Sequence, residues 1–184
     1  MQIMYVILSH LPQAFLRKAY NVLRDYFHPP ITDVVLHGCS LPLSACHWML
    51  SHDGVPVEVD NDEGTAASVE VEGDHLEDPL AMMVACAHAA RCLPSDPIFQ
   101  AQILGATAGL LYNPTTVKDV VCASDPDGED EWMLGADQPT VLDFTAYACL
   151  PASTEDAPQL ERLRQRVDLL MQPWKSSSPS TESE

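Results

Sequence analysis

The stretch at residues 53–78, DGVPVEVDNDEGTAASVEVEGDHLED, holds ten of the chain's 27 acidic residues and no Lys or Arg. Valine alternates with acid in both of its halves, at 55–60 and again at 68–72. A period of two sends one set of side chains to the core and the other set to solvent. Each half is therefore predicted to form a half-buried strand, and the two strands are predicted to pair as a hairpin.

Pairing of these strands would gather four carboxylates, Glu58, Asp60, Glu70 and Glu72, on one open face. Like charges that lie opposite one another across a strand pair are destabilising, so such a face favours a cationic partner. A plain alternative is an acidic surface that only keeps the protein soluble. On the first interpretation these four residues bind a partner, and Trp132, which lies in a second acidic loop, supplies an apolar anchor.

The composition around this stretch supports a globular, acidic protein. The chain has 184 residues, of which 46% are hydrophobic, and a formal net charge of -18. That charge excludes general affinity for nucleic acid or anionic lipid, because both need basic patches, and it favours a basic protein partner. We expect a single α+β domain over residues 1–173 and a disordered polar tail over 174–184.

Cysteine usage and the first residues bear on the compartment. Six cysteines occur in a chain long enough to fold without disulfides, and several lie in apolar runs, where a free Cys behaves as a small hydrophobic residue. The start of the chain shows no basic leader, and no apolar run reaches the length of a membrane span. These features predict a cytoplasmic protein without a transmembrane helix.

The remaining pattern predicts strands and helices in alternating blocks. Proline and acidic caps predict helices at 80–93 and 98–108, and a three-four spacing of leucines predicts another that follows residues 153–156. An amphipathic helix is predicted at 12–27 and a loop at 39–45. Further strands are predicted at 3–8, 31–36, 47–51, 110–112, 117–123, 132–134 and 140–150. Strands at both ends with helices between them predict a two-layer α+β fold, in which helices cover one face of a mostly antiparallel sheet.

Cysteine and histidine offer two other chemistries. His88 and Cys92 lie four residues apart and so share a helix face, and a zinc ion held there would draw its other ligands from Cys39, Cys46 and His47. Cys86 lies well round the helix from both, and a buried helix that tolerates Cys and His is the more usual explanation of the pattern. Cys39 could also act as a nucleophile with His37, His47 or His52 as its base, although a strongly negative chain disfavours the thiolate. Asp53, Asp60, Asp62 and Glu63 could hold Mg²⁺ or form a solvated surface.

No phosphate-binding, dinucleotide-binding, hydrolase or metalloprotease motif occurs. The sequence therefore favours a protein that is not an enzyme and needs no cofactor. Our first hypothesis is an immunity-type inhibitor that neutralises a basic toxin; a DNA-mimic inhibitor is less favoured, because it would not need so large an apolar core. The alternative is an acidic chaperone or adaptor for a secreted effector, acting as a homodimer through its last helix. A zinc protein or Cys/His enzyme is the third hypothesis.

Overall fold

The computed structural model describes residues 31, 34–38, 40–60, 66–125, 130–154 and 157–175, without the side chains of 172–175. The chain divides into two compact units, Met1–Ile31 and Thr32–Glu184, and the description below concerns the second. The predicted strand at 3–8, the predicted helix at 12–27 and nearly all of the predicted tail lie outside the described residues. The predicted boundary of a single domain at residue 173 stays a prediction.

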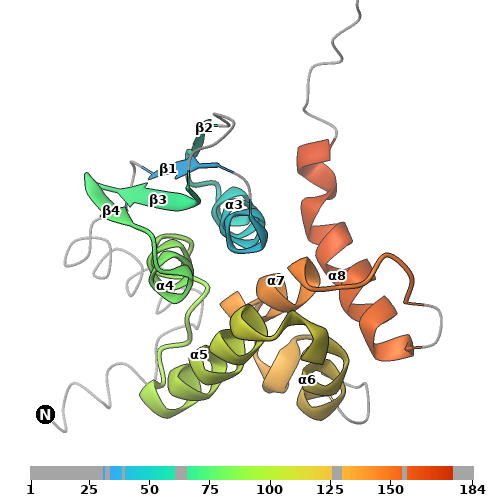
Figure 1. The fold of residues 1–184 in the computed structure, drawn as a ribbon. Helices are drawn as coiled ribbons and strands as arrows, with labels where there is room; N and C mark the ends of the chain where they lie inside the picture. The colour runs from blue at the N-terminus through green and yellow to red at the C-terminus, as the bar shows by residue number, and fades with distance from the viewer. Residues whose placement is uncertain are drawn as a thin grey trace, which may run out of the picture. The chain divides into compact units, whose positions relative to one another are not determined.

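A four-stranded sheet forms the first layer (Figure 1). Its strands are β1 (Val34–His37), β2 (Glu58–Asp60), β3 (Ser68–Val71) and β4 (Asp74–Leu76), in the order β2-β1-β3-β4. β1 runs parallel to β2, and the other pairs are antiparallel. Because β1 lies between β2 and β3, the predicted acidic hairpin is wrong. The hairpin that does form joins β3 to β4 through Glu72 and Gly73, which have φ of 51° and 88°.

The helices α3 (Leu41–Asp53) and α4 (Pro79–Ala89) lie against one face of this sheet (Figure 1). Valine and leucine side chains of β1 and β3 point to that side, and Val34, Leu36 and Val69 are 0–2% exposed. α3 and α4 also pack on each other. The predicted α+β class, with a sheet and helices on one of its faces, is confirmed, although the sheet is mixed.

α3 replaces both the loop predicted at 39–45 and the strand predicted at 47–51. Ser40 is its N-cap, and Pro42 lies in the first turn, where a missing N–H costs nothing. Gly54 ends the helix in the left-handed conformation, with φ of 73°, so it is a helix C-cap and not a hairpin turn. Proline in this segment therefore marks the start of a helix, and not the loop that was predicted.

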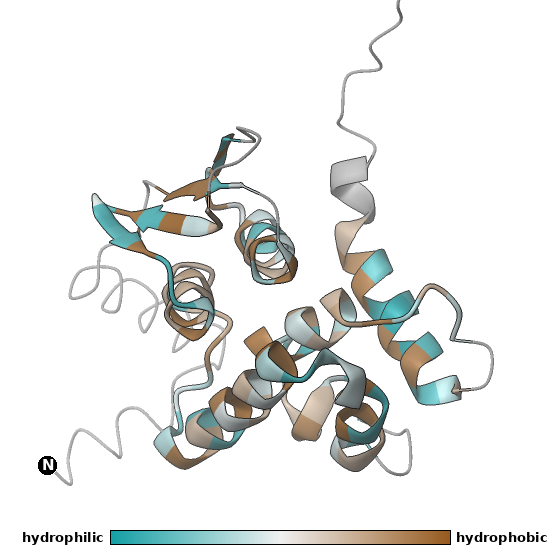
Figure 2. Cartoon of the chain, viewed as in Figure 1, coloured by the Kyte–Doolittle hydropathy of each residue, from teal (hydrophilic) through white to brown (hydrophobic). Residues whose placement is uncertain are grey.

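Four further helices complete the described unit: α5 (Pro97–Tyr112), α6 (Val117–Ser124), α7 (Val141–Ala148) and α8 (Pro158–Lys175). Short 3-10 turns occupy Pro114–Thr116 and Met133–Gly135. The strands predicted at 110–112, 117–123, 132–134 and 140–150 are wrong, whereas the helices predicted at 80–93, 98–108 and after 153–156 are confirmed. Hydrophilic and hydrophobic bands along α8 show the predicted apolar stripe (Figure 2). Among the described residues, no helix is long and apolar enough to cross a membrane.

α7 lies at the centre of the unit, in contact with α3, α5 and α8. The carboxylate of Asp143 in its first turn is fully buried and accepts three hydrogen bonds. The donors are the Met133 amide at 2.9 Å and the amide and hydroxyl of Thr140, both at 2.8 Å. Burial raises the pKa of Asp143, while these hydrogen bonds act to lower it. One side chain thus joins the start of α7 to the preceding loop.

Candidate functional site

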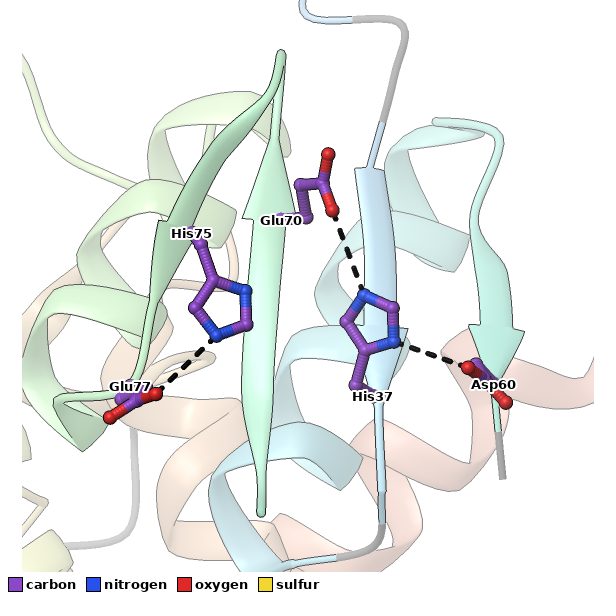
Figure 3. A network of polar contacts seen from close by, with 5 residues as sticks. All are labelled: His37, Asp60, Glu70, His75 and Glu77. Carbon is purple, nitrogen blue, oxygen red and sulfur yellow. Dashed lines mark hydrogen bonds and ion pairs between the residues drawn. The ribbon is translucent and has the colours of Figure 1, made fainter. Parts of the chain in front are cut away.

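The face of the sheet opposite α3 and α4 carries the charged side chains (Figure 3). The register places Glu58 and Glu70 beside Val35, and Asp60 beside His37, so three of the four predicted partner-binding carboxylates share this face. Glu72 lies in the exposed β3–β4 turn instead. The carboxylates gather on one face as predicted, but on strands that β1 separates. Their role in binding a partner stays a prediction.

His37 lies between two of these carboxylates (Figure 3). Its Nδ1 is 3.4 Å from the Asp60 Oδ2, and its Nε2 is 3.8 Å from the Glu70 Oε2. On β4, His75 Nε2 is 3.5 Å from Glu77 Oε1, and the two imidazole centroids are 6.2 Å apart. A histidine of the same chain, which is positively charged when protonated, therefore lies against two of these carboxylates. This removes the main reason for inferring an external basic protein.

The N-terminus of α3 lies directly after β1, at the carboxyl end of the parallel pair β1–β2. Ser40 Oγ accepts from the Leu43 amide at 3.5 Å, and the Gly38 amide donates to the Asp60 carbonyl at 2.8 Å. A helix N-terminus attracts anions because its first amides point outward and its dipole is positive there. In open sheets with parallel strands, ligands bind beyond the strands' carboxyl ends.

The caps of the neighbouring helices differ from that of α3. Asp78 caps α4 by accepting from the Ala81 amide at 2.8 Å, and Asp96 caps α5 by accepting from the amides of Ile98 and Phe99. A carboxylate therefore already occupies each of those N-termini. α3 has a neutral hydroxyl as its cap and no acidic residue in its first turn. Of these three helix ends, the α3 N-terminus is the one best suited to an anionic ligand.

The sequence contained a signal for this site. Serine two residues before a proline is a helix N-cap pattern, whereas the loop predicted at 39–45 rested on Pro42 alone. Cys39, the predicted nucleophile, lies outside the described residues. His52 is exposed on the last turn of α3, and burial lowers the pKa of the half-buried His47.

Two of the cysteines proposed as zinc ligands, Cys46 and Cys92, lie in the interior. Cys46 and Cys86 are fully buried, and Cys46 Sγ lies 3.7 Å from the Met82 carbonyl and 3.6 Å from the Met83 sulfur. Burial raises the pKa of Cys46 well above its usual value and raises that of Cys92 to about 12, so neither favours a thiolate. His88 is exposed on the surface of α4. In the described part of the chain, no group of three or more His, Cys, Asp or Glu could hold a metal ion.

Trp132 is 6% exposed and lies beside the buried Met133, so its side chain does not form a surface anchor. It directly precedes the 3-10 turn that places the Met133 amide against Asp143. Two residues of the apolar triplet in this acidic loop, Trp132 and Met133, are thus part of the core, and Leu134 is half-buried.

No protein-family model matches the chain, and a search of curated proteins finds no similar sequence. Solved structures do match. Rat hPGDS complexed with a quinoline aligns with a TM-score of 0.63 at 16% identity, over 82% of this chain and 99% of that one. Prostaglandin synthase D of Nilaparvata lugens gives 0.59 at 13% identity, over 79% and 98%. A Burkholderia glutathione transferase homologue with bound glutathione gives 0.55 at 13% identity, over 79% and 99%.

The chain has the glutathione-transferase fold. This corrects the functional hypotheses drawn from the sequence: an immunity-type inhibitor of a toxin, an effector chaperone and a protein without enzymatic activity. They rested on an acidic ribbon that needed an external cation. The ribbon is instead the open face of the sheet in a fold shared with enzymes, and His37 of the same chain lies among its carboxylates.

Proposed function

We propose that this protein binds glutathione at the N-terminus of α3 and acts there as a glutathione transferase. The observation that carries the proposal is the neutral Ser40 cap at the carboxyl end of β1, since carboxylates cap α4 and α5. The glutathione bound to the Burkholderia homologue, whose fold this chain shares, supports the choice of ligand. A cytoplasmic location, where thiols stay reduced, belongs to the same proposal.

The chemistry follows from the charge of the ligand. Glutathione carries two carboxylates and a thiol, and a helix N-terminus favours the negative charge of either group. A thiol held at such a position has a lowered pKa, so more of it is present as the nucleophilic thiolate. The thiolate then attacks an electrophilic carbon, a sulfur–carbon bond forms, and the leaving group departs with the electron pair of the broken bond.

Titration calorimetry with glutathione tests the proposal, using a matched pair of cap substitutions. Ser40→Asp keeps a good N-cap but places a carboxylate where the ligand's negative charge would lie. We expect it to weaken binding at least about 10-fold, because like charges at one helix terminus repel. Asp96→Ser makes the reverse exchange at the N-cap of α5 and should leave binding unchanged.

Binding that is equal in wild type and Ser40→Asp would place the ligand elsewhere, and no binding to wild type would refute the proposal. Conjugation of glutathione to an aromatic halide, followed by absorbance, then tests the transferase step. Binding without conjugation would leave a glutathione-binding protein and remove the enzymatic part.

We also propose a homodimer, formed through α5 and not through the last helix. The 16 residues of α5 include no charged side chain. After Pro97, its exposed residues recur every three or four positions and so share one face: Ile98, Ala101, Gln102, Gly105, Gly109 and Tyr112. No atom lies within 4 Å of a Cβ built on Gly105 or Gly109, which leaves room for a second helix to approach.

A second copy of α5 is the partner that fits this face. Two chains of net charge -18 repel one another over most of their surfaces, and an uncharged helix face reduces that repulsion. Exposed apolar groups at both ends of the face, Ile98 at 74% and Tyr112 at 69%, would be covered by a twofold-related copy.

A further inference from the structure

The ring of His37 contacts carboxylates on both of its neighbouring strands. β1 is flanked by β2 and β3, and the imidazole presents Nδ1 to Asp60 of β2 at 3.4 Å and Nε2 to Glu70 of β3 at 3.8 Å (Figure 3). The side chain thus spans three strands on the open face of the sheet.

A neutral imidazole cannot satisfy both of these contacts. It carries one N–H and one lone pair, so it donates to one carboxylate while its lone pair faces the other. An imidazolium has two N–H groups, so it donates to Asp60 at 3.4 Å and attracts the Glu70 carboxylate by charge at 3.8 Å. Uptake of one proton therefore replaces a repulsive contact between a lone pair and a carboxylate with an attractive one.

Among the described residues of strands β1–β4, histidines are the side chains that can carry positive charge. Glu58 of β2 shares this face, the ring of His75 on β4 lies near that of His37, and Glu77 after β4 contacts His75. No Lys or Arg occurs in the sequence between residues 25 and 90. α3 and α4 pack on the opposite face, so their side chains do not screen the cluster (Figure 1). Histidine changes its charge between about pH 5 and pH 8.

We propose that His37 is a proton-operated clamp that fastens strand β2 to the sheet. β2 has three residues, all exposed, and it is the edge strand beside β1. Besides its strand pairing, it is held by the bond from the Gly38 amide to the Asp60 carbonyl. When His37 is protonated, the attraction of its imidazolium for the Asp60 carboxylate adds to this backbone bond. The clamp does not depend on glutathione binding.

Hydrogen exchange of the Gly38 amide, measured by NMR on the full chain, tests the clamp. Protection factors at about pH 5.5 and about pH 8, corrected for intrinsic exchange, are divided by that of the Phe144 amide in α7. We expect the ratio to be about 2- to 5-fold higher at the lower pH in wild type, the size of an exposed ion pair. His75→Gln should keep this change, because the contact of His75 is with Glu77.

Two variants should lose this pH-dependent change in the protection ratio of the Gly38 amide. His37→Gln keeps a hydrogen-bond donor but gains no charge, and Asp60→Asn keeps the histidine but removes the carboxylate on β2. In both, the ratio should be the same at the two pH values. The clamp is overturned if wild type shows no pH-dependent change, or if His37→Gln and Asp60→Asn retain it.

Discussion

Asp143 links α7 to the preceding loop in the interior of the described unit. It is fully buried, yet its carboxylate accepts hydrogen bonds from Met133 and twice from Thr140. Burial disfavours its charge and the hydrogen bonds favour it, and the net result is a pKa raised above the ordinary value of an aspartate. A group that binds its proton more tightly when folded stabilises the fold most at low pH.

We therefore predict a pH-dependent cost of Asp143→Asn, measured by urea unfolding of both proteins across pH. The variant should lose about 1–3 kcal/mol at about pH 4, because an amide group faces donors that the carboxyl group satisfied. The stability advantage of wild type should then shrink as pH rises from the unfolded value of about 3.9 through the raised folded pKa. Groups shared by both proteins cancel in the difference. An advantage that grows with pH would show that the hydrogen bonds outweigh burial.

At the scale of elements, two glycines on helices should respond to alanine in opposite ways. Neither Gly54 nor Gly105 has an atom within 4 Å of an added Cβ, so packing does not distinguish them. Gly54 has φ of 73° at the C-cap of α3, whereas Gly105 lies inside α5. Gly54→Ala should destabilise the protein by about 1 kcal/mol because of the left-handed backbone. Gly105→Ala should stabilise the monomer, measured at a concentration below that at which the proposed α5 dimer forms, by about 0.5–1 kcal/mol.

Thermal unfolding of the two variants under identical conditions measures this contrast. Equal signs for the two changes would contradict the assignment of Gly54 to a left-handed cap or of Gly105 to a helix interior.

The elements also show what sequence reasoning could and could not find. Amphipathic α8 and the proline-capped α4 were predicted, because a helical stripe and an Asp-Pro cap are local signals. α7 was predicted as a strand because it is buried nearly all round, so its apolar residues show no period that separates helix from strand. The Thr140–Asp143 spacing, a helix-start signal, was available and was not used.

The alternation of valine and acidic residues could not predict the order of the strands in the sheet. Alternation correctly placed Glu58, Asp60 and Glu70 on an open face, since parity alone decides it. It could not show that β1 lies between β2 and β3, because pairing depends on contacts distant in sequence. For the same reason the sequence did not predict the contacts of His37, because its carboxylate neighbours come from two other strands. The candidate site at the α3 N-terminus was likewise not predicted, because the segment that forms α3 was predicted as a loop and a strand.

At the scale of the whole molecule, the proposed dimer can be tested by sedimentation equilibrium. Ala101→Glu places a charge in the middle of the uncharged α5 face and should raise the dimer dissociation constant at least about 10-fold. Val59→Glu adds the same charge at an exposed apolar residue on β2, 41% exposed, and should leave dimerisation unchanged. A monomeric wild type at micromolar concentration, or equal effects of both substitutions, would contradict an interface on α5.

The central claim, a glutathione site at the N-terminus of α3, is tested most directly by an NMR titration of the labelled protein with glutathione. The account predicts saturable shifts of amide signals in residues 38–44 and 58–60, and their loss in Ser40→Asp. Shifts centred on the N-terminus of α4, or none at millimolar glutathione, would contradict it.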